Sequence, residues 1–281
     1  MAAAVSSGLV APVVDFYNYV LSLRDPRTAG WSLVADPKFM FPVLFGYIYV
    51  VKIGGPRWMM NRKPFDLKPA IMVYNLSMVI ANIFFFYQYL RHSYLGGGYN
   101  VFCQGVSYSR DENAMTILNL TWWYLFVRIA DFFDTFFFLA RKKFSHISVL
   151  HVLHHFLVVL SGWLWITFGC DGQVLMGICF NSFIHIIMYS YYFLAALGPK
   201  VQKYLWWKKY LTRLQIFQFV YLTLHVSIPI FYDCGYPKIL TVLATAQGML
   251  GLGLFINFYI NAYTQNGSTD FCTVQGMKKD D

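Results

Sequence analysis

Long apolar stretches separated by short polar loops run through most of the chain. Seven of these stretches are long enough to cross the hydrocarbon core of a bilayer, which takes about 20 helical residues. They cover residues 37–54, 70–90, 117–139, 147–168, 172–196, 210–231 and 238–263. The pattern predicts an all-α polytopic membrane protein with seven transmembrane helices, of which the fourth and fifth form a tight hairpin around residues 170–173.

The composition agrees with a membrane protein. Of 281 residues, 58% are hydrophobic and only 12% are charged, about half the charged share of a soluble domain. The net charge of +9 does not indicate a nucleic-acid partner, because the basic residues form no continuous stripe and lie between apolar segments.

Basic residues are distributed unevenly over alternate loops, and this distribution predicts the orientation of the chain. The loops of one side and the C-terminal tail hold 14 of the 22 lysines and arginines, and the other side holds six. We expect the richer side to be cytosolic, which leaves the N-terminus lumenal and the C-terminus cytosolic.

The spans predict a single transmembrane domain over residues 1–265. The polar residues 266–281 are expected to form a flexible tail, which the orientation places in the cytosol. Lys278 and Lys279 occupy the positions of a di-lysine retrieval signal, which acts from the cytosol and places membrane proteins in the endoplasmic reticulum. A solvated chain end is the alternative interpretation of such a charged tail.

Three of the five cysteines fall in predicted lumenal loops, where disulfides can form. A bond between Cys103 and Cys234 would join the loop after the second span to the loop before the seventh, and would leave Cys170 unpaired. Three free thiols are the alternative.

Polar side chains inside the third span form the first candidate cluster, because ionisable groups at membrane depth are costly and usually functional. Arg128, Asp131 and Thr135 share one helix face, and Asp134 lies beside them. A buried ion pair that fixes helix packing is as good an interpretation as a catalytic role.

The fourth span opens with three histidines within five residues, His151, His154 and His155. His151 and His155 lie one helical turn apart, so their rings share a face. A single histidine in a span is usually a hydrogen-bonded core residue, but packing does not explain three, and this box is the strongest indication of a site.

Two further spans add polar side chains. The fifth carries a stripe of Asn181, His185, Met188 and Tyr192, and the sixth begins with Thr212, Gln215 and Gln218. Hydroxyls and amides often bridge helices in lipid, and Tyr189 and Tyr191 are also typical of interfacial aromatics.

The predicted orientation puts all these polar residues in the cytosolic half of four spans, on the order of 12 Å below one surface. We therefore expect them to converge on one pocket that opens to the cytosol, with the lumenal half of the membrane domain left apolar. The ligand that fits such a pocket is an amphiphile with a polar head in the cytosol and a long apolar tail.

The motifs resemble those of the ELO family of very-long-chain fatty acid elongases, the 3-oxoacyl-CoA synthases of the endoplasmic reticulum. The family's H-x-x-H-H box matches residues 151–155, its N-x-x-x-H-x-x-M-Y-x-Y-Y motif residues 181–192 and its T-x-x-Q-x-x-Q motif residues 212–218. The likeness runs from Asn61 to the seventh span and is greatest to the vertebrate group that acts on saturated and monounsaturated very long chains.

The chain departs from the family pattern at several positions. The family's K-x-x-E-x-x-D-T reads Arg128, Asp131, Asp134, Thr135 here. Because arginine does not readily give up its proton, an electrostatic role at this position survives the change and a role that needs neutral lysine does not. His146 stands where relatives usually have glutamine, and residues 265–266 replace basic residues, which removes one contact to coenzyme phosphates.

The resemblance implies that acyl-CoA condenses with malonyl-CoA to 3-oxoacyl-CoA, with release of CO2 and CoA, through an acyl-histidine intermediate. It implies His154 as the nucleophile and His185 as its partner near the condensing carbons. The other implied catalytic residues are His151, His155, Asp131 and Asp134. The implied substrate-binding residues are Arg128, Arg141, Lys143, His146, Asn181, Tyr191, Lys208, Thr212 and Gln215.

The same resemblance implies six helices in a barrel around an acyl tunnel that is closed at its lumenal end, with the first span outside. Phenylalanines and tyrosines of spans two, three and seven would limit chain length there, and Gly248, Gly251 and Gly253 would allow close helix approach. No cofactor, metal or nucleic acid is implied. The other enzymes of the elongation cycle are implied partners, and a homo-oligomer stays open.

Two other functions fit parts of the pattern. A membrane di-iron desaturase or hydroxylase also uses histidine boxes, but it needs about eight histidines in several boxes, and this chain has seven and one box. A seven-span receptor or lipid transporter fits the orientation, but its ligand would approach from the lumenal side, whereas the predicted polar layer faces the cytosol.

Overall fold

The computed structural model describes residues 12, 14–15, 17–33 and 37–265 of the chain. The predicted tail with Lys278 and Lys279 lies outside the described residues. Within the described part the ordered elements are helices and no strand is present, which confirms the all-α prediction.

Six helices among the described residues are long and apolar enough to cross a membrane, and they show a multi-pass membrane protein. For five of these helices, the ends lie within a few residues of the ends of the predicted spans. The first helix continues past its predicted end, residue 54, to Met59. The helices are α2 (Pro37–Tyr49) continued by η1 (Val50–Gly54) and α3 (Gly55–Met59), α4 (Lys68–Leu90) continued by η2 (Arg91–Leu95), α7 (Val149–Phe168), α8 (Val174–Ala196), α10 (Lys208–Phe231), and α11 (Lys238–Ile260) continued by η4 (Asn261–Gln265).

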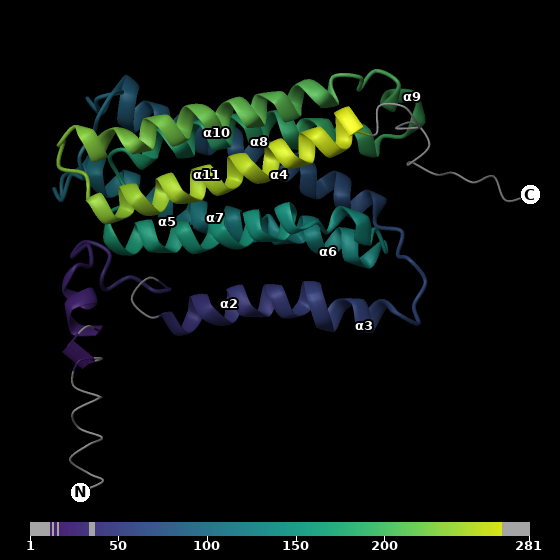
Figure 1. Cartoon of the computed structure of the whole chain (residues 1–281), viewed down its shortest axis with the longest axis horizontal. Coiled ribbons are helices and arrows are strands. Elements are labelled where there is room, and N and C mark those ends of the chain that lie inside the picture. Colours follow the sequence, from purple (N-terminus) through teal and green to yellow (C-terminus); the bar gives the residue numbers. More distant parts are fainter. Residues whose placement is uncertain (1–11, 13, 16, 34–36, 266–281) are drawn as a thin grey trace, which may run out of the picture.

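The third predicted span differs from this set because it is divided into α5 (Glu112–Ala130) and α6 (Phe132–Ala140). Asp131, between them, keeps right-handed helical angles (φ −60°, ψ −18°), and its carbonyl accepts the Asp134 N–H at 3.2 Å. The backbone therefore forms one tighter turn at Asp131, and in Figure 1 α6 follows α5 toward the end of the bundle that holds α9 (Pro199–Gln202). The divided helix carries three of the charged candidate residues, Arg128, Asp131 and Asp134.

The long helices contact one another in a closed cyclic order. Helix α4 packs against α5 and α8, α5 against α7, α7 against α11, α11 against α10, and α10 against α8. Helix α2 packs on the outside of α7, and Figure 1 shows it as a separate rod below the others. Two short helices, η3 (Phe144–His146) and α9 (Pro199–Gln202), lie in loops at the end of the bundle where α6 and α8 finish.

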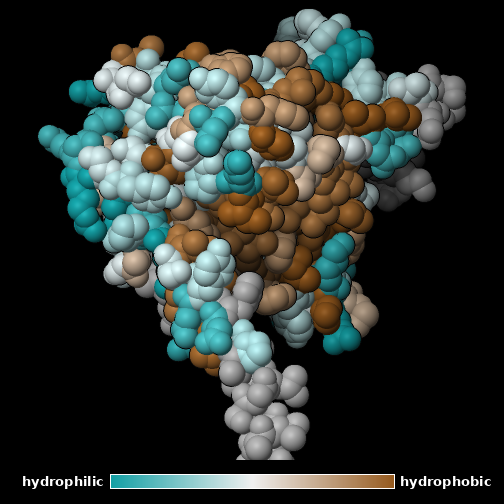
Figure 2. All heavy atoms as spheres, turned by 60° about the vertical axis from the view of Figure 1, so that its left-hand side comes forward, coloured by the Kyte–Doolittle hydropathy of each residue, from teal (hydrophilic) through white to brown (hydrophobic). Residues whose placement is uncertain are grey.

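The outward faces of the long helices are apolar. Phe45, Ile80, Trp123 and Leu224 each keep 60–65% of their surface exposed. Figure 2 shows apolar side chains gathered on a flank of the bundle and hydrophilic ones at its ends. In water such a surface would be costly, whereas in hydrocarbon it is the expected outer face of a membrane protein.

The end of the bundle opposite α9 is closed by a buried polar cluster. Arg27 bonds Asp25 (Nη2 to Oδ2, 2.7 Å) and Asp171 (Nη1 to Oδ2, 3.4 Å), and all three side chains have no exposed surface. Gln173 donates to the carbonyl of His225 at 2.7 Å. The expectation of an apolar half at this end is therefore wrong, because the loops that close the bundle bring backbone groups that need buried partners.

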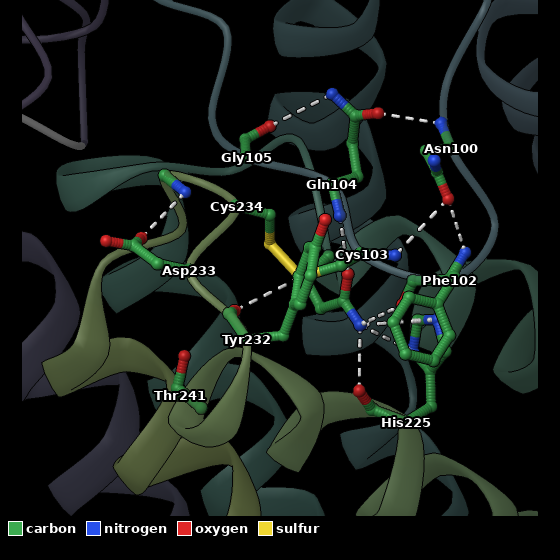
Figure 3. The surroundings of a disulfide bond; sticks show 12 residues. Asn100, Phe102, Cys103, Gln104, Gly105, His225, Tyr232, Asp233, Cys234 and Thr241 are labelled. Atoms are coloured by element: carbon green, nitrogen blue, oxygen red, sulfur yellow. Dashed lines mark hydrogen bonds between the residues drawn. A yellow bond between two sulfur atoms is a disulfide. The ribbon is translucent and has the colours of Figure 1, made fainter.

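A disulfide joins two loops of this closed end. Cys103 and Cys234 are bonded with their Cα atoms 5.9 Å apart, and these are the two cysteines that the sequence analysis paired. Figure 3 shows the bond among Asn100, Gln104 and Tyr232. Cys170 and Cys179 are free and buried. The loop after α4 and the loop before α11 are thereby fastened to each other.

Candidate functional site

The histidine box begins α7. The hydroxyl of Ser148 accepts the backbone N–H of His151 at 3.2 Å, so Ser148 is the N-cap and the three histidines occupy the first two turns. The rings of His151 and His155 lie 4.3 Å apart, as their spacing predicts. The cap thus sets where the box stands relative to the other helices.

His151 belongs to a chain of hydroxyl contacts that reaches the outer helix. Its Nε2 lies 2.8 Å from the hydroxyl of Thr135 on α6, which in turn lies 3.0 Å from the hydroxyl of Tyr47 on α2. Tyr47 is buried and stacks on Phe132 with ring centroids 3.9 Å apart. The orientation of the His151 ring is therefore controlled from two other helices.

His154 faces the interior between three helices. Its ring lies 6.3 Å from Phe219 on α10 and 6.2 Å from Phe255 on α11, measured between centroids. It nevertheless keeps part of its surface accessible, and among the hydrogen bonds of the described residues none involves its ring. His154 thus combines an inward position with ring nitrogens that are available to a ligand.

Arg128 is the centre of the most connected polar group. Its side chain is 2% exposed and donates to Asn82 on α4 (Nη2 to Oδ1, 3.0 Å) and to Asn181 on α8 (Nη1 to Oδ1, 3.0 Å). It also contacts His185 Nδ1 at 2.7 Å and pairs with Asp131 Oδ2 at 3.2 Å. The histidine box contacts the same α5–α6 rod, because His151 lies 2.8 Å from the Thr135 hydroxyl.

The two carboxyl groups meet at one phenol. The hydroxyl of Tyr189 lies 2.9 Å from Asp131 Oδ1 and 2.7 Å from Asp134 Oδ2, and Tyr189 is fully buried. The hydroxyl of Tyr74 lies 3.2 Å from the same phenol oxygen. Tyr189 is therefore an internal residue, and its interpretation as an interfacial aromatic is wrong.

The polar residues of the sixth span lie beside this group and are not joined to it by hydrogen bonds within the described residues. The hydroxyl of Thr212 contacts the Lys208 carbonyl at 3.4 Å, and Gln215 Nε2 contacts the sulfur of Met188 at 3.8 Å. Tyr191 packs edge-on against Trp207 at 5.1 Å. These residues come from α8 and α10, the two helices that flank α9 in the sequence.

Basic residues gather at the same end, in the loop between α6 and α7 and at the start of α10. Partial burial and the neighbouring Arg141 lower the pKa of Lys143. Partial burial lowers the pKa of His146, and the nearby charges of Lys143, Lys208 and Arg141 lower it further. The cationic groups therefore repel one another here, and a bound anion would relieve that repulsion.

An apolar hollow of about 240 Å³ lies between α7 and α11. Its α7 wall, residues 157–165, comes directly after the histidine box, and its α11 wall runs from Leu240 to Leu250. Among the residues that line the hollow, only Ser161 has a hydroxyl and only Gln247 has a side-chain amide, and these two groups are hydrogen-bonded to each other. The hollow is the kind of surface that accepts a hydrocarbon chain.

Three residues that hold the site were missed by the sequence reasoning: Tyr47, Asn82 and Tyr124. Tyr124 donates to Asn181 at 2.9 Å, and its ring lies 4.6 Å below the guanidinium of Arg128. The available signal for Tyr124 was its place one turn before Arg128, and for Asn82 it was an amide inside an apolar span. Tyr47 gave no such signal, because a tyrosine near a membrane interface is ordinary.

The acidic and histidine side chains of the described residues do not form a metal-binding arrangement: no group of three or more His, Cys, Asp or Glu is placed to hold one ion. Asp131 and Asp134 are turned to Tyr189 and Arg128 instead.

Comparison with known proteins identifies the family. The model of the GNS1/SUR4 (ELO) family matches residues 32–270, which is most of the chain. The chain belongs to the ELO family. Its relatives include a very long chain fatty acid elongase of Aedes aegypti, 41% identical over 91% of this chain and 72% of the relative. Very long chain fatty acid elongase 7 of Drosophila melanogaster is 42% identical over 89% and 76%, and elongase 4 of Mus musculus is 39% identical over 90% and 80%.

Family membership confirms the resemblance inferred from the ELO motifs. The relatives span nearly the whole of the described helices, so the histidine box, the α5–α6 rod and the α8 stripe all lie inside the matched region.

Proposed function

We propose that the chain is the condensing enzyme of very-long-chain fatty acid elongation, a 3-oxoacyl-CoA synthase. Acyl-CoA and malonyl-CoA are its substrates, and no resident cofactor takes part. The observation that carries the proposal is that the histidine box and the Arg128 group contact the same α5–α6 rod, inside a membrane bundle whose family members are named fatty acid elongases.

In the first half of the reaction, the unprotonated ring nitrogen of His154 attacks the thioester carbon of acyl-CoA. The C–S bond breaks, and CoA leaves as a thiolate that takes up a proton from water. The accessible ring of His154, with Phe219 and Phe255 beside it, supports this assignment. His151 and His155 are its neighbours on α7, and the first is oriented by Thr135.

In the second half, the bond between malonyl C2 and its carboxylate breaks, CO2 leaves, and the electron pair forms an enolate. C2 then attacks the acyl carbon on His154, and the pair of the C–N bond returns to the ring nitrogen. Asp131 and Asn181 hold Arg128 beside His185. The hydroxyl of Tyr189 contacts the carboxyls of Asp131 and Asp134 and so fixes both of them. The net reaction consumes one proton, the one taken up by the CoA thiolate.

The coenzyme moiety binds at the basic end, to Arg141, Lys143, His146 and Lys208. The lowered pKa values of Lys143 and His146, which come from burial and neighbouring cations, support an anion site. Charge-assisted bonds to phosphate oxygens suit this group of side chains. Tyr191, Thr212 and Gln215 line the path from that end toward the condensing carbons.

The fold proposed for this function has seven membrane spans, with α5 and α6 together as the third, and six of them form a barrel around an acyl tunnel. The cyclic contact order of α4, α5, α7, α11, α10 and α8 and the outside position of α2 support it. The polar cluster around Arg27 closes the tunnel at the far end, and the apolar hollow along α7 accepts part of the chain.

We place the protein in the endoplasmic reticulum membrane with the N-terminus in the lumen and the C-terminus in the cytosol. The bond between Cys103 and Cys234 supports a lumenal position for the closed end, because disulfides form in that compartment. The proposed partners, besides the substrates, are the other enzymes of the elongation cycle, and a homo-oligomer is compatible with the exposed helix faces.

The test uses the purified full chain with radiolabelled malonyl-CoA and acyl-CoA substrates of C16 to C26. We expect chain extension in the wild type and a loss of about 1,000-fold or more in His154→Ala, because no other group replaces a nucleophile. Acyl transfer to protein from labelled acyl-CoA alone should disappear in the same variant. His92→Asn, at the far end of the bundle, is the control. Normal condensation by His154→Ala would refute the nucleophile, and no extension of any substrate by the wild type would refute the function.

A further inference from the structure

The contact between Arg128 and His185 determines where the proton of His185 lies. Arg128 Nη1 and His185 Nδ1 are 2.7 Å apart, the shortest contact that the guanidinium makes. A guanidinium has N–H donors and no acceptor, and it stays charged in proteins. His185 Nδ1 must therefore present its lone pair, and the proton of the neutral ring lies on Nε2.

The contact between Asn181 and the other ring nitrogen of His185 is then a van der Waals contact and not a hydrogen bond. Asn181 Nδ2 lies 3.4 Å from His185 Nε2, and its own Oδ1 is occupied by Tyr124 and Arg128. The Asn181 amide therefore presents N–H groups to His185. The two contacts cannot both be hydrogen bonds to a neutral ring, and the short charged one decides the tautomer.

Arg128 cannot easily turn away from His185. Asn82 and Asn181 hold it from two other helices, Asp131 pairs with it from the next turn, and the ring of Tyr124 lies under its guanidinium. The residue is 2% exposed. The partners of Arg128 are therefore side chains of three helices inside the bundle.

We propose that Arg128 is a positioning residue that keeps His185 neutral with its proton on Nε2, so that His185 donates a hydrogen bond to the malonyl thioester oxygen. The proposal rests on the condensing function above and divides the work between two histidines. His154 offers a lone pair to the acyl carbon, and His185 offers an N–H to the oxygen on which charge develops.

The chemistry explains why the neutral form suits this task. When CO2 leaves malonyl-CoA, the electron pair of the broken bond spreads to the thioester oxygen, and an N–H donor there stabilises the enolate. A charged imidazolium in the same place would be acidic enough to give its proton to C2. That transfer would yield acetyl-CoA, and no new C–C bond would form. A neutral donor stabilises the enolate and leaves C2 free to attack.

The decisive variants are Arg128→Lys, which keeps a charged donor, and Arg128→Met, which keeps only the stem. Three products are measured with the purified full chain: CoA released from acyl-CoA alone, 3-oxoacyl-CoA formed with malonyl-CoA, and acetyl-CoA. For Arg128→Met we expect the first half-reaction within about threefold of wild type, because His154 is untouched, and condensation lower by about 100-fold, as for loss of one oxyanion donor. The KM for malonyl-CoA should change little, and the share of acetyl-CoA should rise. Arg128→Lys should keep most of the wild-type condensation activity.

Histidine NMR gives a readout that does not depend on activity. With ¹⁵N-labelled histidine, one ring should show an unprotonated Nδ1 and a protonated Nε2 at neutral pH, and its signals should vanish in His185→Gln. Arg128→Met should abolish this pattern and Arg128→Lys should keep it. The reverse tautomer, an unchanged pattern in Arg128→Met, or equal loss of both half-reactions would overturn the proposal. A wild type that shows the tautomer but transfers no acyl group would instead refute the proposed function.

Discussion

Single side chains at this site are held by partners on other helices, and their protons can be counted. The phenol of Tyr189 has one proton and contacts both Asp131 and Asp134 within 2.9 Å. The Tyr74 hydroxyl also lies 3.2 Å from the Ala130 carbonyl, so it has a second acceptor. Tyr189 thus links the two carboxyl groups of the α5–α6 rod to α8, and Arg128 pairs with Asp131.

The buried carboxyl at the opposite end provides a pH test. Burial, first of all, raises the pKa of Asp171 from 3.8 to about 6, although Arg27 acts in the other direction. In the folded state the Asp171 carboxyl is half-protonated near pH 6, whereas in the unfolded chain it is half-protonated only near pH 4. This carboxyl contributes stability that is present below about pH 4 and is lost as pH rises through about 6, in total on the order of 3 kcal/mol.

The variant Asp171→Asn keeps an oxygen for the Ser107 N–H, which Asp171 Oδ1 now accepts at 3.0 Å, and removes the titration. We expect its melting temperature to gain on wild type as pH rises from about 5 to about 7.5. Thermal unfolding in detergent at a series of pH values measures the difference between the two proteins. Parallel pH profiles would contradict the raised pKa.

Helices α10 and α11 approach each other at two glycines of α11. A Cβ added at Gly248 would lie 2.4 Å from Thr223 Oγ1, and one at Gly251 would lie 2.4 Å from Phe219 Cε1. A Cβ at Gly253 would meet no atom within 4 Å, so the predicted close approach is confirmed for the first two glycines and wrong for the third. The close approach sets the place of Phe219 beside His154.

Gly251→Ala tests this contact, and Gly253→Ala is its matched control in the same helix. We expect Gly251→Ala to destabilise the protein by about 1–3 kcal/mol, the usual cost of an added group in a filled interface. It should also lower activity, because Phe219 must move. Gly253→Ala should change the unfolding free energy by less than about 0.5 kcal/mol. Melting in detergent compares them, and equal effects would refute the interface as the cause.

The two ends of the whole bundle are built for different tasks. The α9 end carries the basic residues around Lys143 and Lys208, and the opposite end is closed by the Arg27 group and the disulfide. Arg27, Asp25 and Asp171 at the closed end are buried and pair with one another, so they hold loops in place. The basic side chains at the α9 end are partly accessible, as a binding surface requires.

Removal of the disulfide tests the fastening of the closed end. Cys103→Ser with Cys234→Ser should lower stability by about 2–5 kcal/mol, because the bond closes a long loop of 131 residues. The double variant should run more slowly on a non-reducing gel, while Cys179→Ala, at a free buried cysteine, should run like wild type. Maleimide labelling of Cys103 in wild type without reductant would contradict the bond.

Some features of the site could be read from spacing along one helix and others could not. The box at His151, His154 and His155 and the shared face of Arg128 and Asp131 follow from helix periodicity alone. The partners of Arg128 could not be predicted, because Asn82 and Tyr124 act only when α4, α5 and α8 meet. The helix break at Asp131 was also missed, because the residue spacing along a span does not show a local tightening of the backbone.

The amino-acid sequence by itself determined the membrane class, the approximate helix ends, the histidine box and the family. These depend on hydropathy and on spacing within one helix, and both are local properties of the chain. Only the tertiary structure decided that Asp131 and Asp134 share the phenol of Tyr189, that Arg128 contacts His185, and that a second buried polar cluster closes the far end. Each of these depends on which atoms of different helices come within about 3 Å, and hydrogen-bond geometry at that range is not encoded in the order of residues along one segment.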